Sequence, residues 1–275
     1  MSDPSFPLPF YLQADEGKRF CVLHAPPRTP SGAWLYVPPF GEEMNKSRRM
    51  VSLQAQALAA SGVAVLVMDL HGCGDSEGEL RDARWETWHA DLRLGLAWLS
   101  ARFSCPVGLW GLRLGALLAL DFLERNETTL PCLLWQPVFN GSTFLTQFLR
   151  LRVAASMASG DSSRITTQAL REKLHQGEIL EIGGYDLTPE LAHALDHVNL
   201  SETPPLHLPI QWFELQGPNG LPTPATQRLL ESWQTRGGRV TFHSFAGEPF
   251  WQTQEITDCP DLITRSTGQM LHALH

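Results

Sequence analysis

The stretch that decides the fold is Pro106-Val-Gly-Leu-Trp-Gly-Leu-Arg-Leu-Gly-Ala-Leu-Leu-Ala-Leu120. It begins with a short apolar run, which is typical of a buried strand. Gly111 and Gly115 flank Arg113 and predict a sharp turn, because glycine lets the backbone pass close to its neighbours. The apolar residues that follow predict a helix over Gly115–Glu124. The segment is therefore expected to form a strand, a tight turn and a helix, with Arg113 at the turn.

Strand and helix signals alternate on both sides of this segment. The run over Val63–Asp69 is almost wholly apolar, as expected of a central parallel strand covered on both faces. The other expected strands are Phe20–His24 (at a sheet edge), Ala33–Val37, Val107–Trp110, Leu130–Trp135, Ile210–Leu215 and Val240–Phe245. Helices are expected over Ser47–Ser61, Trp85–Arg102, Pro224–Thr235 and Leu262–Leu274. This alternation predicts a single α/β domain over residues 1–275, with a mostly parallel, doubly wound sheet.

The middle of the chain has a different character. From Asn140 to about Leu206 the signals are helical, without a convincing strand. Thr188-Pro189-Glu190 supplies an N-cap, a proline at the first helical position and an acid in the first turn. We therefore expect a helical cap over about 140–206, inserted between strands 6 and 7 above the carboxyl ends of the strands.

Composition excludes several classes of function. The formal charge of −8 argues against a nucleic-acid partner, because phosphate contacts need clustered basic residues. The five cysteines lack metal-ligand or disulfide spacing, so we expect no metal site and a reducing, cytoplasmic location. We expect no cofactor either. The first residues lack the features of a signal peptide, and we find no apolar run long enough to span a membrane.

A strand, a sharp turn and a helix are the setting of the G-x-S-x-G nucleophile elbow, which presents a serine above the edge of an α/β-hydrolase sheet. The order of elements also matches an α/β-hydrolase whose cap lies between its sixth and seventh strands. In this chain the elbow reads Gly111-Leu-Arg-Leu-Gly115, so Arg113 stands where the serine would be.

Three segments extend the resemblance over nearly the whole chain: Tyr36–Arg49 (YVPPFGEEMNKSRR), Gly111–Gly115 (GLRLG) and Gly247–Glu255 (GEPFWQTQE). They resemble the bacterial family called exosortase A system-associated hydrolase 2. The resemblance implies an α/β-hydrolase fold and a hydrolase or acyl-transfer activity. It also implies a link to exopolysaccharide production or PEP-CTERM protein sorting, and a protein partner in that pathway.

The positions of the catalytic triad depart from the superfamily. The acid usually follows the seventh strand, where Asn219 or Gly220 stands. The histidine usually follows the last strand, where Phe250 or Trp251 stands. A Ser-His-acid mechanism needs a base within reach of a nucleophile, and none of these positions supplies one. Two functional classes remain open: an enzyme with a non-standard site, and a non-catalytic relative that binds an anionic or acyl ligand or a partner protein.

Other candidate sites are weaker. Gly74-Asp-Ser-Glu-Gly78 matches G-x-S-x-G, but the next helix begins several residues later, so we interpret Ser76 as a loop or capping hydroxyl. His71 and Cys73 share that glycine-rich loop, where their side chains need not face each other. His193 and His197 are four apart on a cap helix and lack the Glu of H-E-x-x-H, so we interpret them as a surface face.

Three roles are open for Arg113. It can pair with a glutamate, with Glu43 expected first and Glu42 or Glu248 as alternatives. It can bind an anionic ligand, since a guanidinium at a helix N-terminus suits carboxylate or phosphate. It can act as an electrophile while a glutamate activates water. An unpaired buried guanidinium is the arrangement that physics disfavours.

The pocket expected around Arg113 contains backbone donors and aromatic side chains. The amides of Phe40 and Leu114 are expected at the two oxyanion-hole positions. Trp135 and Trp251 are expected to line the pocket with Phe40 and Phe250. The expected ligand-binding residues are Phe40, Glu42, Glu43, Arg113, Leu114, Trp135, Glu248 and Trp251.

Overall fold

The computed structural model describes residues 7–158, 165–202, 205–217 and 220–274. Within these ranges the main sheet has eight strands in the order β1-β2-β4-β3-β5-β6-β9-β10. The strands are β1 Leu8–Gln13, β2 Lys18–His24, β3 Gly32–Val37, β4 Val63–Met68, β5 Val107–Leu112, β6 Cys132–Trp135, β9 Pro209–Leu215 and β10 Arg239–Phe245. Strands β1 and β2 run antiparallel at one edge, and all pairings from β4 to β10 are parallel.

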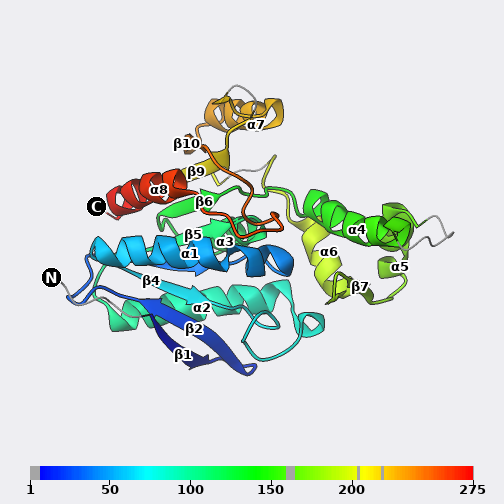
Figure 1. Ribbon diagram of the computed structural model, residues 1–275, viewed down its shortest axis with the longest axis horizontal. Coiled ribbons are helices and arrows are strands. Elements are labelled where there is room, and N and C mark those ends of the chain that lie inside the picture. The colour runs from blue at the N-terminus through cyan, green and yellow to red at the C-terminus, as the bar shows by residue number, and fades with distance from the viewer. Residues whose placement is uncertain (1–6, 159–164, 203–204, 218–219, 275) are drawn as a thin grey trace.

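Helices cover both faces of this sheet (Figure 1). On one face lie α1 Glu42–Ala60 and α8 Pro260–Ala273, which contribute Met50, Leu58, Leu262 and Met270 to one buried cluster. On the other face lie α2 Trp85–Arg102, α3 Leu114–Arg125 and α7 Pro224–Thr235. Alternation along each strand fills both layers: Trp34 and Tyr36 of β3 face α1, whereas Ala33 and Leu35 belong to the cluster with α2 and α3.

The insertion lies between β6 and β9, the sixth and seventh strands of the main sheet. It contains α4 Gly141–Ala158, α5 Thr167–His175 and α6 Pro189–His197, and forms the lobe at the right of Figure 1. The Thr188 hydroxyl accepts a hydrogen bond from Leu191 N at 3.3 Å, so the predicted N-cap is present. The expectation that this region has no strand was wrong, because β7 Leu180–Ile182 and β8 Tyr185–Leu187 form a small antiparallel pair.

The place of one strand in the sheet and the start of one helix also differ from the sequence-based expectation. Phe20–His24 is not at the edge, because β1 pairs with β2 outside it. Helix α1 begins at Glu42, five residues before the expected Ser47, so Glu42 and Glu43 lie in a helical first turn rather than in a loop. Gly41 precedes them with φ 64°, a conformation that glycine adopts without strain.

The register of the parallel strands places the elbow. Val37 pairs with Gly111, and Leu112 pairs with Trp135, which in turn pairs with Phe213. The carboxyl ends of β3, β5, β6 and β9 therefore lie at the same edge of the sheet. Residues that follow these strands come together there, although they are far apart in the sequence.

Candidate functional site

Arg113 occupies the turn between β5 and α3 and has φ 54° and ψ −119°. A positive φ is rare for a residue with a side chain, and here it accompanies the sharp turn expected from Gly111 and Gly115. The backbone N–H of Arg113 donates to Trp135 O at 3.0 Å, which fixes the turn against the end of β6. A Cβ on Gly115 would meet the carbonyl oxygens of Val37 and Pro38, so only glycine lets α3 approach the end of β3 this closely. The elbow is therefore present, with arginine at its apex.

The guanidinium of Arg113 is paired with Glu43. Its Nε donates to Glu43 Oε1 at 3.1 Å, and the two side chains are 11% and 19% exposed. The Cζ atom lies 5.7 Å from the centroid of the Trp251 ring, within range of a cation–π interaction. Nη1 reaches Gln136 O at 3.5 Å, a long contact. The ion pair uses Nε and the Gln136 contact uses Nη1, so within the described chain Nη2 remains available to another acceptor.

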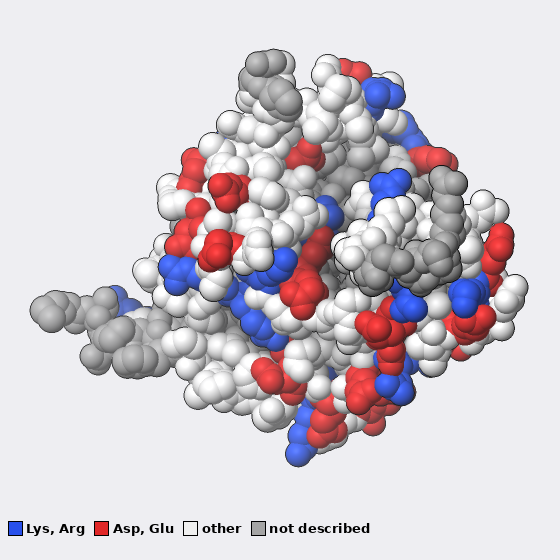
Figure 2. Space-filling view, turned by 45° about the vertical axis from the view of Figure 1, so that its right-hand side comes forward, with Lys and Arg blue, Asp and Glu red and all other residues white. Residues whose placement is uncertain are grey.

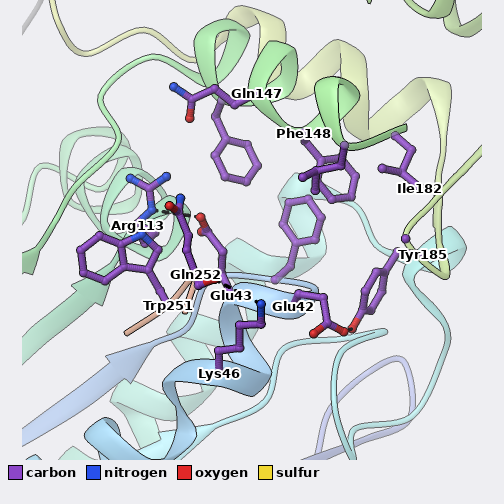
Figure 3. A pocket seen from close by; sticks show the side chains of 14 residues that line it. Glu42, Glu43, Lys46, Arg113, Gln147, Phe148, Ile182, Tyr185, Trp251 and Gln252 are labelled. Carbon is purple, nitrogen blue, oxygen red and sulfur yellow. Dashed lines mark hydrogen bonds and ion pairs between the residues drawn. The ribbon is translucent and has the colours of Figure 1, made fainter. Parts of the chain in front are cut away.

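The pair lies in the wall of a cavity of about 390 Å³ between the elbow and the insertion (Figure 3). This volume is within the range of small-molecule sites. Figure 2 shows the face that is hollowed here, with side chains of both charges around the hollow. The lining residues are Phe40, Glu42, Glu43, Lys46, Arg113, Phe144, Gln147, Phe148, Leu151, Ile182, Gly183, Tyr185, Trp251 and Gln252.

The two glutamates at the start of α1 have different surroundings. Burial raises the pKa of Glu43, and the Arg113 guanidinium opposes that rise without cancelling it. Glu42 Oε1 accepts a hydrogen bond from the Tyr185 hydroxyl at 3.1 Å. Burial and this bond to a carboxylate raise the pKa of Tyr185 to about 12, so the phenol remains protonated at neutral pH. The cavity thus has one buried ion pair, and a second carboxylate, that of Glu42, which is hydrogen-bonded to Tyr185 of the insertion.

Backbone donors are also present where the fold would bind an oxyanion. Leu114 N is the first amide of α3, and it donates no hydrogen bond within the described chain. The same holds for Phe40 N, in the segment after β3. A helix N-terminus carries partial positive charge, so unpaired amides beside it favour an anionic oxygen.

Several predicted residues do not line the cavity. Trp135 is fully buried, and its Nε1 donates to Ser266 Oγ of α8 at 2.9 Å. Phe250 is 1% exposed and packs edge-on against Trp135 and Trp251. The Leu114 side chain is buried in the α2–α3 layer, so only its amide can take part. These residues support the elbow from behind, because strand and helix side chains alternate between the site and the core.

Two further expectations concern Glu248, as an alternative partner of Arg113, and Asn219 or Gly220, at the position of the triad acid. Glu248 is exposed and forms no ion pair within the described chain, so it is not the partner of Arg113. Gly220 lies after β9 with φ 72°, and Asn219 lies outside the described residues. A carboxylate does occur on this strand: Glu214 is buried and accepts from Thr226 Oγ1 at 2.6 Å. Glu214 precedes the loop in which an acid was sought.

The weaker candidates have structural roles. Ser76 Oγ donates to Asp69 O at 2.6 Å and accepts from Phe20 N at 2.9 Å, so it ties the glycine-rich loop to β2. Burial raises the pKa of Cys73 far above its usual range, which opposes a nucleophilic role. His71 Nε2 lies 4.0 Å from Glu16 Oε2 instead.

The histidine pair on α6 is at the surface. His193 and His197 are exposed, with ring centroids 4.2 Å apart. In the part of the chain that the structure describes, no cluster of three or more His, Cys, Asp or Glu side chains could hold a metal ion. None of the helices within the described ranges has both the length and the apolar composition that a membrane crossing requires.

The sequence did not predict most of the cavity-lining residues that the insertion contributes. Phe144, Phe148 and Leu151 of α4 are four and three residues apart, so they share one helix face. Lys46 lies one turn after Glu42 and Glu43 on α1. This spacing would have identified Lys46 if the helix had been predicted to begin at Glu42. Tyr185 has no comparable signal, because its place depends on the β7–β8 pair.

No protein-family model and no curated protein sequence matches this chain. Many solved structures do. Est1E from Butyrivibrio proteoclasticus, solved with bound ferulic acid, matches with a TM-score of 0.68 at 13% identity, over 96% of this chain and 98% of that one. A thermostable carboxyl esterase from Bacillus coagulans matches with a TM-score of 0.61 at 15% identity, over 97% of both chains.

Alpha/beta hydrolase domain-containing protein 10 from mouse matches with a TM-score of 0.56 at 16% identity, over 96% of this chain and 97% of that chain. Identities this low carry the fold and not the activity. The chain has the α/β-hydrolase fold, with a mostly parallel sheet and an insertion between its sixth and seventh strands.

Proposed function

We propose that the protein is a non-catalytic α/β-hydrolase relative that binds an amphipathic carboxylate, such as a fatty acid, in the cavity between the elbow and the insertion. The observation that carries the proposal is the position of Arg113. The fold presents the elbow residue to the substrate carbonyl in hydrolases, and here it presents a guanidinium. Arginine recognises carboxylates through planar pairs of N–H donors.

The polar end of the cavity supports an anionic head group. Arg113 keeps its outer nitrogens free of any carboxylate in the described chain. Lys46 has no carboxylate partner there either; its Nζ makes only a 3.4 Å contact with Gln252 O. The amide of Phe40, a residue that lines the cavity, adds a donor that has no acceptor within the described chain.

The other end of the cavity supports an apolar tail. Phe40 and Phe144 pack edge-on at 5.6 Å between centroids, and Phe40 and Phe148 do so at 5.0 Å. Leu151 of α4 and Ile182 of β7 also line the cavity and continue this apolar surface. An alkyl chain on such a wall gains about 0.8 kcal/mol for each methylene removed from water.

The lining of the cavity argues against covalent catalysis. Within the described chain it includes no serine, threonine, cysteine or histidine. Its one hydroxyl belongs to Tyr185, whose pKa of about 12 and bond to Glu42 keep it protonated. A covalent mechanism needs an activated nucleophile beside a base.

One observation favours a second candidate, hydrolysis by activated water. The raised pKa of Glu43 brings this carboxyl toward the range that suits a general base. Arg113 and the two free amides would then stabilise the oxyanion. In this mechanism Glu43 takes a proton from water as the water oxygen attacks the acyl carbon, and it returns that proton to the alcohol or thiol as the bond between the acyl carbon and the leaving group breaks.

We also propose a cellular setting from the three motifs that resemble exosortase A system-associated hydrolase 2. The ligand would belong to exopolysaccharide production or PEP-CTERM sorting, with binding to a pathway protein as a further possibility. Loss of the protein from its host should then alter exported polymer or sorted proteins, whereas unchanged amounts of both would contradict this setting.

A paired screen separates the two candidates. The purified protein, Arg113→Met and the surface control Arg102→Met are tested for turnover of esters, thioesters and phosphate esters. The same proteins are melted with octanoate, decanoate and dodecanoate. The binding proposal expects no turnover and a rise in melting temperature that Arg113→Met abolishes and Arg102→Met keeps. Turnover that disappears in Arg113→Met and in Glu43→Gln would replace it with the hydrolytic candidate.

A further inference from the structure

A second cavity, of about 250 Å³, lies between the start of α1 and the edge of the sheet. Its polar walls come from His24 of β2, Tyr36 of β3, Asp69 after β4, and Arg48 and Ser52 of α1. The parallel and antiparallel registers bring these strand positions to one face, since Val67 pairs with both Val22 and Tyr36. Residues 48 and 52 are one helical turn apart and face the strands.

Two buried polar side chains in this cavity lack partners. His24 and Tyr36 are each 4% exposed, and neither the His24 ring nitrogens nor the Tyr36 hydroxyl makes a hydrogen bond within the described chain. Both side chains line the cavity, so their polar atoms face its interior. Neither the His24 nitrogens nor the Tyr36 hydroxyl is among the fully buried atoms that lack a partner, so each is reached from the cavity, where water or a small molecule can bond to it.

The charges in the cavity already balance. Arg48 Nη2 donates to Asp69 Oδ2 at 2.9 Å, and Asp75 N donates to the same oxygen at 3.0 Å. Burial lowers the pKa of His24 and raises that of Tyr36, so both groups are uncharged at neutral pH. An anion would find no unpaired positive charge, and a cation would find no unpaired carboxylate.

The unpaired groups define the complementary chemistry. A neutral imidazole and a phenol can each donate and accept hydrogen bonds, as an alcohol does. Ser52 Oγ accepts from Gln56 Nε2 at 3.0 Å and keeps its own proton to donate. Val22, Val51 and Val67 supply an apolar wall beside these groups. We propose that this cavity is a binding site for a small uncharged hydroxyl compound, a diol or short polyol.

This inference does not depend on the cavity at Arg113, and its test is separate. Saturation-transfer NMR is recorded with 1,2-propanediol and erythritol as probes, and with acetate and inorganic phosphate as anionic comparisons. We expect saturable binding of a hydroxyl probe and weaker binding of both anions. Tyr36→Phe should weaken the binding about three- to ten-fold, the effect of losing one hydrogen bond. Tyr11→Phe, which removes an exposed hydroxyl, should leave it unchanged.

Amide shifts in the unaltered protein provide a readout that no folding defect can disturb. The probe should move the amide signals of Val22 and Val67 more than that of Arg113. His24→Leu should weaken binding as Tyr36→Phe does. The inference is overturned if neither hydroxyl probe saturates the protein, if acetate or phosphate binds as tightly, or if the shifts cluster at Arg113.

Discussion

Arg113 Nε and Glu43 Oε1 lie 3.1 Å apart, although the residues are 70 positions apart in the sequence. The pair joins the elbow after β5 to the first turn of α1. Both side chains are mostly buried, so each charge depends on the other for compensation. The turn between β5 and α3 therefore presents a charged side chain, and the start of α1 supplies its partner.

A double-mutant cycle on thermal stability tests that dependence. Glu43→Gln leaves Arg113 unpaired and Arg113→Met leaves Glu43 unpaired, whereas the double mutant leaves neither charge buried. We expect each single change to destabilise the protein and the double mutant to be more stable than additivity predicts, with a coupling of about 1–3 kcal/mol. Strict additivity would mean that the ion pair contributes nothing to the folded state.

Gly115→Ala should be severely destabilising. The added Cβ would meet the carbonyl oxygens of Val37 and Pro38, which are backbone atoms and cannot rotate away. We expect a loss of at least about 3 kcal/mol in the free energy of unfolding, measured by chemical denaturation. Gly268→Ala is the matched control in α8, because its Cβ would meet nothing within 4 Å. That change should stabilise the helix by up to about 1 kcal/mol. Equal effects at the two positions would contradict the close approach of α3 to β3.

Ser76→Ala tests whether the second G-x-S-x-G motif is structural. The change removes the acceptor of Phe20 N and the donor to Asp69 O. We expect a loss of about 1–3 kcal/mol in stability and unchanged binding of fatty carboxylates. Ser61→Ala removes an exposed hydroxyl that donates to Ala57 O and should cost less than about 0.5 kcal/mol. Unchanged stability combined with lost binding or turnover would give Ser76 a functional role.

Glu214→Gln should change how stability depends on pH. Burial raises the pKa of Glu214 above its ordinary value of 4.5, so the folded protein holds this proton more tightly than the unfolded chain. The stabilisation by that proton is complete at pH values below the pKa of the unfolded chain. It is lost as the pH rises through the pKa of Glu214 in the folded protein. The variant lacks this loss and can still accept from Thr226. Its melting temperature relative to the parent should rise as the pH increases above about 4.5. The exposed Glu231→Gln should show no such trend, and a falling difference for Glu214→Gln would contradict the shift.

Local patterns predicted the main elements well. Helices α2 and α7 have the bounds expected from the sequence, because their amphipathic pattern and N-terminal residues are local signals. Strand β1 was missed because its residues are mostly exposed and its identity depends on pairing with β2. The start of α1 was missed because Gly41 gives no side-chain cap, so no capping residue marks Glu42. The three-residue strands β7 and β8 are too short for any periodicity.

The site was predictable only where topology determines it. Arg113 and Glu43 follow adjacent parallel strands, and the fold brings those ends together whatever the loops contain. The wall from Phe144 and Phe148 depends on which face α4 turns toward the elbow, and no local pattern sets that orientation. Trp135 was misplaced for a related reason: the last residue of β6 can face the site or the core, and its bond to Ser266 fixes it in the core.

Calorimetric titration with octanoate and 1-octanol tests the central claim, that Arg113 makes this cavity a carboxylate site. The two probes share a chain length and differ in the charged head. We predict that the unaltered protein binds octanoate more tightly than 1-octanol. In Arg113→Met, octanoate affinity should fall about 10- to 100-fold, as expected for lost charge-assisted hydrogen bonds. The affinity for 1-octanol should change less than about three-fold, because the apolar wall remains. Octanoate affinity that is unaffected by Arg113→Met, or falls no more than that of 1-octanol, would contradict the account.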